Sequence, residues 1–167
     1  MGKLLVGGAL GALTLALSAC SGSSSSAGSD AALQHESDLY RISQIEKNMH
    51  EALSKKDIDQ VMSLFAPHAT ATFGPGKTVS GKGRIRAMWL KSPVFKSKTN
   101  WLSDHPAYKL KVTVDGDRGT LRFECHFVDV RTRKVVVVTA ADQDVARVAD
   151  RWLITNFVGS TTELKIS

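Results

Sequence analysis

The chain has 167 residues, a formal net charge of +6 at pH 7 and a hydrophobic share of 43%. This length suits one domain with a substantial hydrophobic core and leaves no room for a second domain of ordinary size. Only two cysteines are present, so an intramolecular disulfide is excluded if either of them is modified.

The N-terminus has the features of a lipoprotein signal peptide. Lys3 supplies a positive charge, and residues 4–16 form an apolar run that is short for a transmembrane helix but long enough for a signal-peptide core. The run ends in the letters LSAC (residues 17–20), which resemble the lipobox of bacterial lipoproteins. This resemblance implies cleavage after residue 19 and a lipid on Cys20. The alternative is an ordinary secretory cleavage site followed by a chance cysteine.

These features predict three parts of the chain. Residues 1–19 are expected to be the signal peptide. Residues 20–30 are expected to be the lipidated cysteine and a flexible tether, because the letters SGSSSSAGSD cannot bury apolar area. Residues 31–167 are expected to form one folded domain. The protein is therefore expected to be exported and anchored by lipid to a bacterial membrane in the cell envelope.

The first half of the folded part is predicted to be helical. A long helix is expected from residue 31 to 56, because apolar residues recur there at spacings of three and four, namely Ile42, Ile45, Met49, Ala52 and Leu53. A second, shorter helix is expected to start at the N-cap Asp57 and to stop at Pro67. A short strand is expected at residues 69–73, and a third helix from about Gly81 to Ser92.

The second half is predicted to be an antiparallel meander. Alternation over residues 107–114 places Tyr108 and Val112 on one face of a strand, and Asp115-Gly116 indicates a hairpin turn. Residues 120–127 alternate in the same way, with Phe123 and Cys125 on the buried face. Polar turns at 131–134 and 149–151 lead into two further strands. Helices followed by strands indicate an α+β domain.

This order of elements resembles the SnoaL-like branch of the nuclear-transport-factor-2-like superfamily over about residues 41–157. The letters that carry the resemblance are ALSKKDIDQVMSLFAPHATATF, SGKGRIRAMW, HPAYKLKVTVDGDRG and DVARVADRWLI. It implies a cone-like α+β fold with three N-terminal helices packed on a curved antiparallel sheet of four or more strands. Such a fold encloses an apolar cavity. Members include dehydratases, isomerases, cyclases and non-catalytic binding or assembly domains, so the fold does not determine the function.

The resemblance also implies candidate site residues. Enzymes of this superfamily place a carboxylate and a histidine or tyrosine in the cavity, where burial raises the carboxylate pKa. The usual tyrosine and aspartate positions fall on Met49 and Ser54, which favours binding without catalysis. His105 and Asp144 could still form a catalytic pair, or could be an edge histidine and a solvent-facing aspartate. Cavity residues are expected to be Met49, Phe65, Trp89, Trp101, Tyr108, Phe123 and Cys125.

A basic run without acidic residues surrounds the third predicted helix, and consists of Lys77, Lys82, Arg84, Arg86, Lys91, Lys96 and Lys98. In an exported lipoprotein it is not expected to bind nucleic acid. It could lie on anionic lipid headgroups, guard the mouth of a cavity for an anionic ligand, or be a solvated face. The letters GKTVSGKG (76–83) lack the hydroxyl that a phosphate-binding loop has after its lysine, and no nucleotide is expected.

Three functional hypotheses remain. The first is a cell-envelope protein that binds a small apolar ligand or a protein partner without catalysis and without a cofactor. The second is a dehydratase, isomerase or cyclase that uses His105 and Asp144. The third is a dimeric assembly module, because residues 135–138 (VVVV) place valine on both faces of a strand. The histidines show no spacing typical of metal ligands, and no metal site is expected.

Overall fold

The computed structural model describes residues 25–96, 100–104 and 107–163. Its helices are α1 (Ser25–Lys55), α2 (Ile58–Ser63), α3 (Lys82–Lys91) and the short 3-10 turn η1 (Pro93–Phe95). Its strands are β1 (Phe65–Phe73), β2 (Val79–Ser80), β3 (Trp101–Ser103), β4 (Tyr108–Asp115), β5 (Arg118–Asp129), β6 (Val135–Val148) and β7 (Arg151–Glu163). None of the helices in these ranges is long and apolar enough to span a membrane.

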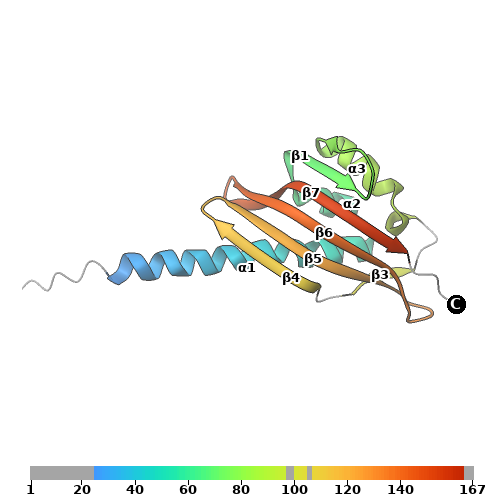
Figure 1. Cartoon of the computed structure of the whole chain (residues 1–167), viewed down its shortest axis with the longest axis horizontal. Coiled ribbons are helices and arrows are strands. Elements are labelled where there is room, and N and C mark those ends of the chain that lie inside the picture. The colour runs from blue at the N-terminus through green and yellow to red at the C-terminus, as the bar shows by residue number, and fades with distance from the viewer. Residues whose placement is uncertain (1–24, 97–99, 105–106, 164–167) are drawn as a thin grey trace, which may run out of the picture.

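The seven strands form one curved sheet, and α1 lies along one of its faces (Figure 1). The strand order is β2-β1-β7-β6-β5-β3, and β4 also pairs with β5. The pairs β4–β5, β5–β6 and β6–β7 are antiparallel, as the meander predicts, but β1 pairs with β7 in parallel. The sheet is therefore mixed, and the prediction of an entirely antiparallel sheet was wrong. The α+β architecture with helices on a curved sheet is confirmed.

The core forms where the apolar stripe of α1 meets the inner face of the sheet. Ile42 and Met49 of α1 are at most 1% exposed, and Leu121 and Phe127 of β5 are equally buried. Each such side chain contributes roughly 1.5–3 kcal/mol through its burial. The alternating residues of β5, such as Arg122 and Glu124, lie on the other face and stay at least partly exposed. The predicted stripe and the predicted alternation are both confirmed.

Two helix boundaries differ from the prediction. Helix α1 begins at Ser25, six residues before the expected start, so residues 25–30 are helical and do not belong to a coil-like tether. Figure 1 shows this first part of α1 projecting beyond the sheet. Helix α2 is capped by Asp57, whose side chain accepts from the Gln60 amide at 2.9 Å, but it ends at Ser63. The predicted stop at Pro67 was wrong because Pro67 already lies in β1.

Helix α3 starts as predicted, because Gly81 turns the chain. Gly81 is its N-cap with a φ of +87°, a conformation that residues with a Cβ rarely adopt. Ser92 ends the helix before Pro93. The letters GKTVSGKG thus form a turn, the short strand β2 and the start of α3.

A bulge in β4 reverses the face of its first residues. Lys109 has a φ of +53°, and the register to β5 shifts between Tyr108 and Lys111. Val112 therefore points towards the core, whereas Tyr108 is 43% exposed and stacks on His126 with ring centroids 4.1 Å apart. Simple alternation placed Tyr108 on the Val112 face, and the inserted residue makes that placement wrong.

A buried ionic cluster fastens α1 to one end of the sheet. Asp38 is 4% exposed and accepts hydrogen bonds from Arg147 (2.6 Å), Trp152 (3.0 Å) and Gln34 (3.0 Å). Arg147 also donates to Asp117 at 2.8 Å and lies over the Trp152 ring. Chiefly because of the Arg147 hydrogen bond, the pKa of Asp38 falls from 3.8 to about 2. The cluster joins α1, the β4–β5 turn, β6 and β7.

Removing the Arg147 guanidinium should destabilise the fold strongly. The substitution Arg147→Met leaves the buried Asp38 carboxylate without its main partner, which typically costs about 3 kcal/mol. The measurement is urea unfolding of the variant and the parent at neutral pH. The matched control is Arg122→Met, because Arg122 pairs with Asp142 on the surface, with exposed fractions of 66% and 55%. Such surface pairs contribute at most about 1 kcal/mol.

The difference between Arg147→Met and the parent should also depend on pH. A depressed carboxyl pKa stabilises the folded state above its unfolded pKa, and this contribution is lost as the pH falls through the folded value. We therefore expect the difference to shrink as the pH falls from about 4 to about 2. A difference that stays constant over this range would show that Arg147 acts through packing alone.

Candidate functional site

An apolar cavity of about 310 Å³ lies between α1, α3 and the sheet, at the end away from Asp38. Helix α1 contributes Met49 and Leu53, and the segment from α3 to η1 contributes Met88, Trp89 and the four residues from Lys91 to Val94. The sheet contributes the remaining lining residues, which are Phe73, Gly74, Phe123, Cys125, Phe127, Val137, Thr139, Ala140, Ala141, Phe157, Gly159 and Ser160. A volume near 300 Å³ is at the lower end of the range for small-molecule sites.

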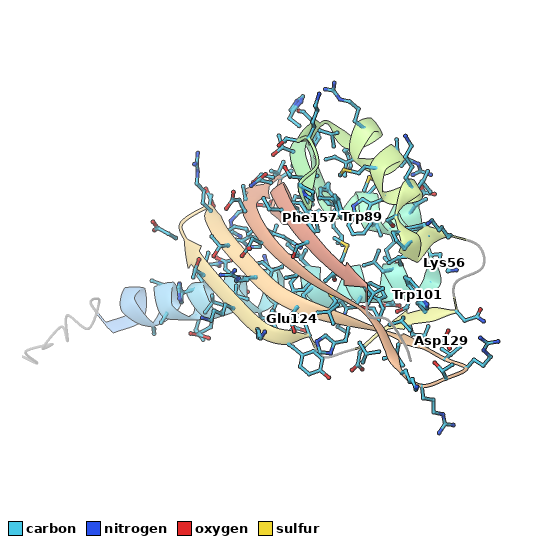
Figure 2. All side chains as sticks on the ribbon, turned by 45° about the vertical axis from the view of Figure 1, so that its right-hand side comes forward. Lys56, Trp89, Trp101, Glu124, Asp129 and Phe157 are labelled. Atoms are coloured by element: carbon cyan, nitrogen blue, oxygen red, sulfur yellow. The ribbon has the colours of Figure 1, made fainter. Side chains whose placement is uncertain are left out.

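Aromatic rings form one wall of the cavity. Phe73 lies edge-on to Trp89 with centroids 4.8 Å apart, and Phe157 lies 5.0 Å from Phe73 and 5.7 Å from Trp89. Figure 2 shows Trp89 and Phe157 side by side below α3. A Cβ at Gly159 would come within 2.6 Å of the Phe157 ring, so glycine at this position lets the ring lie flat against β7.

Three buried polar side chains, those of Cys125, His50 and Glu46, form a row at the opposite wall of the cavity. The imidazole of His50 is 2% exposed, and its Nε2 contacts the Sγ of Cys125 in a hydrogen bond. Its Nδ1 lies 3.2 Å from an oxygen of Glu46, which is 3% exposed and one helical turn earlier on α1. The edge of Phe123 covers the imidazole ring at 5.7 Å. Only Cys125 of these three polar residues lines the cavity.

The environment of the Cys125 thiol determines where the protons of this row of polar side chains lie. Burial raises the pKa of Cys125 from 9.0 to about 12, and the negative charge of Glu46 acts in the same direction. The thiol is therefore protonated at neutral pH and donates to Nε2 of His50. The His50 tautomer then carries its proton on Nδ1, which lies 3.2 Å from the Glu46 carboxylate. The cavity wall thus presents a neutral thiol.

Four of the seven predicted cavity residues line the cavity: Met49, Trp89, Phe123 and Cys125. Phe65 is fully buried but packs against Phe157 from outside the cavity, with centroids 6.1 Å apart. Trp101 lies in β3 and packs on the core without lining the cavity. Tyr108 was predicted to point inwards and lies on the outer face because of the bulge at Lys109.

The predicted pair of His105 and Asp144 does not form part of this cavity as far as the structure describes it. Asp144 is exposed and accepts a hydrogen bond from Asn156 at 3.1 Å, while its neighbour Gln143 points inwards. His105 itself lies outside the described residues. Its described neighbour Asp104 bonds to the backbone of His126, whereas Asp144 pairs with Thr120. Residues 120 and 126 are about 20 Å apart along β5.

The basic residues occupy different environments. Arg84 donates to the Ser80 carbonyl at 2.7 Å, and Arg86 forms an ion pair with Asp59. Lys77, Lys82 and Lys96 lie along the surface from the β1–β2 turn to η1, and Lys98 is outside the described residues. Of the six described members of the set, Lys91 alone lines the cavity.

The sequence patterns did not lead us to predict the polar residues Glu46 and His50 behind the cavity wall. Neither Glu46 nor His50 was predicted to be buried, although the two residues are spaced by four and border the apolar stripe of Ile42, Met49 and Leu53. That spacing signals a wide buried face that includes both polar residues. The four valines of residues 135–138 were taken to indicate a second chain, because they place valine on both faces of their strand. Val136 and Val137 are both buried within the single chain, so burial on both faces needs no second chain.

No group of three or more histidine, cysteine, aspartate and glutamate side chains suited to a metal ion occurs within the described ranges.

Comparisons with known proteins agree with this geometry. The family model of the SnoaL-like domain matches residues 34–158. An NTF2-like protein with a cystatin-like fold from Novosphingobium aromaticivorans superposes with a TM-score of 0.69 at 17% identity, covering 87% of this chain and 94% of that chain. A provisionally assigned dehydratase from Streptomyces avermitilis gives 0.61 at 15% identity, with 77% and 99% covered. A provisionally assigned aromatic ring hydroxylase from Novosphingobium aromaticivorans gives 0.63 at 19% identity, with 77% and 94% covered. No curated protein matches the sequence significantly.

The buried thiol of Cys125 should be unreactive in the folded protein. With a pKa of about 12 and an exposed fraction of 2%, it should react with iodoacetamide at pH 8 at least about a hundred-fold more slowly than in urea. Peptide mass mapping separates the Cys125 peptide from that of Cys20 and measures the rate at Cys125. Equal rates in the folded and unfolded protein would contradict the burial of Cys125.

Proposed function

Because the chain belongs to the SnoaL-like domain family, whose fold holds a cavity between its helices and its sheet, we propose that it binds a small apolar ligand without catalysis. The observation that carries this proposal is the cavity of about 310 Å³ itself. Its wall is built mainly from aromatic and aliphatic side chains, and such a site gains affinity by removing apolar ligand surface from water.

The polar residues of the lining favour binding over proton transfer. Among the described residues, the lining holds no aspartate, glutamate, histidine or tyrosine. A general base must come within hydrogen-bond distance of the proton that it removes. His50 lies behind Cys125 and Phe123, and the raised pKa of Cys125 keeps the thiol neutral. The enzymatic alternative with His105 and Asp144 has less support, because Asp144 is exposed on the outer face.

We also propose that the domain works at a membrane in the cell envelope, held by a lipid on Cys20. The letters LSAC at residues 17–20 support this proposal. Helix α1 begins at Ser25, so the separation between the lipid and the folded part is four residues, shorter than the ten-residue tether that composition predicts. The projecting start of α1 (Figure 1) would then hold the cavity at a distance from the membrane.

Filling the cavity should abolish ligand binding while preserving the fold. Ala141 lies on the inner face of β6, is 5% exposed and lines the cavity. The substitution Ala141→Phe should lower the affinity for the neutral fluorescent probe N-phenyl-1-naphthylamine by more than about ten-fold, because the new ring occupies the ligand's place. Fluorescence titration measures the affinity, and circular dichroism checks the fold.

The matched control is Ala87→Phe, which adds the same ring to the exposed side of α3. We expect this variant to bind the probe as the parent does. If the parent protein does not bind the probe, or if both variants bind it equally well, the cavity is not a ligand site and the proposed function fails.

Lipidation should depend on Cys20 alone. In bacterial cells supplied with labelled palmitate, the parent chain should carry the label and partition into detergent, whereas Cys20→Ser should lose the label and stay in the aqueous phase. The variant Cys125→Ser keeps the LSAC letters and should behave like the parent chain. Label that persists in Cys20→Ser would rule out the proposed anchor.

A further inference from the structure

The cavity wall contains a single charged side chain among the described residues, Lys91 at the end of α3. Asp38 and Arg147 show that a buried charge elsewhere in this protein has a partner of opposite charge, whereas Lys91 is exposed to solvent where it lines the cavity. Within residues 25–96, 100–104 and 107–163, the ammonium group of Lys91 has neither an ion pair nor a hydrogen bond. The wall thus places one uncompensated positive charge at the edge of an apolar space.

Two hydrogen-bond donors next to Lys91 in the sequence also lack partners in the described part of the chain. Trp89 is 5% exposed, and its indole Nε1 is buried without an acceptor; the buried hydroxyl of Ser92 is also without a partner. Both residues line the cavity. Trp152 shows the usual situation, because its Nε1 donates to the Asp38 carboxylate at 3.0 Å. Buried polar groups are nearly always paired, so the Trp89 donor indicates an acceptor that the described residues do not provide.

We propose that the ligand is an apolar organic acid whose carboxylate binds at the end of α3. The ammonium of Lys91 would pair with the carboxylate, and the donors of Trp89 and Ser92 would bond to its oxygens. The apolar body would lie against Phe73 and Phe157. This inference rests on the proposed function and adds the chemical class of the ligand.

The surroundings of Lys91 favour an anion at this place. Helix α3, with the letters KGRIRAMWLK, contains no acidic residue. Lys56, at the end of α1, donates from Nζ to the carbonyl of Lys96 at 3.0 Å and thereby brings a further cation near η1. Figure 2 shows Lys56 at the same end of the molecule as Trp89. Positive charges that gather around an apolar opening attract an anionic ligand and raise its rate of association.

A purely structural role of Lys91 makes a different prediction. As the last residue of α3, a lysine also interacts favourably with the helix carbonyl end. In that case its loss would lower the stability and would affect charged and neutral ligands equally. A comparison of matched ligands therefore separates the two roles.

The experiment measures the affinity of the mature chain for 2-naphthoate and for 2-acetylnaphthalene, its neutral near-isostere, by isothermal titration calorimetry at neutral pH. In the parent protein, 2-naphthoate should bind at least about ten-fold more tightly. The variant Lys91→Met should lose most of this preference by weakening the binding of naphthoate only. Higher salt should lower the affinity for naphthoate and leave that for the ketone unchanged.

The matched control is Lys77→Met, which removes one positive charge from an exposed turn outside the cavity. This variant should keep the preference for 2-naphthoate.

The variant Trp89→Phe retains a ring but removes the Nε1 donor. It should weaken the binding of both ligands, since both carry an acceptor oxygen. Equal affinities in the parent, or an unchanged preference in Lys91→Met, would overturn the inference while the proposed function stands. If N-phenyl-1-naphthylamine and both naphthalenes fail to bind, the proposed function fails as well.

Discussion

The inner face of the curved sheet can be buried only if one helix reaches across it, and the architecture depends on how α1 meets this requirement. Its apolar stripe covers the inner residues of β5 and β6, but a stripe alone would allow the helix to slide or rotate. Two polar contacts fix its position: the Asp38–Arg147 cluster at one end and the contact of His50 with Cys125 further along. Because α1 ends at Lys55 and α3 covers the remaining sheet at some distance, the space between them stays open as the cavity.

Local patterns in the sequence predicted most of the elements because these patterns report which face of a helix or strand is buried. The stripe of α1, the alternation in β5 and the cap at Asp57 depend only on neighbouring residues. The parallel pairing of β1 with β7 could not be predicted in this way, since its partners are about 86 residues apart, as with Thr70 and Asn156. The bulge at Lys109 was hidden too, because a positive φ at a lysine leaves no mark in the sequence pattern.

The candidate site was predictable in part for the same reason. Met49, Trp89, Phe123 and Cys125 follow from the apolar faces of their elements. The Glu46–His50 pair was overlooked because polar residues beside a stripe are usually solvated, and here the sheet curves far enough to cover them. Among the described residues, the buried charged or titratable side chains of α1 are thus Glu46 and His50 behind the cavity wall and Asp38 at the other end of the sheet. This distribution supports the proposal that the protein binds a ligand without catalysis.

The parallel pairing of the first long strand with the last one also affects how the chain matures. The aromatic wall unites Phe73 of β1 with Phe157 of β7, so it cannot assemble until nearly the whole polypeptide has been synthesised. Contacts between residues this far apart in the sequence close a large loop and therefore form slowly. During translation β1 can pair only with the two-residue strand β2 until β7 has been synthesised. A chain built in this way remains unfolded for longer, a property that suits the proposed export, in which the polypeptide crosses a secretion channel before it folds.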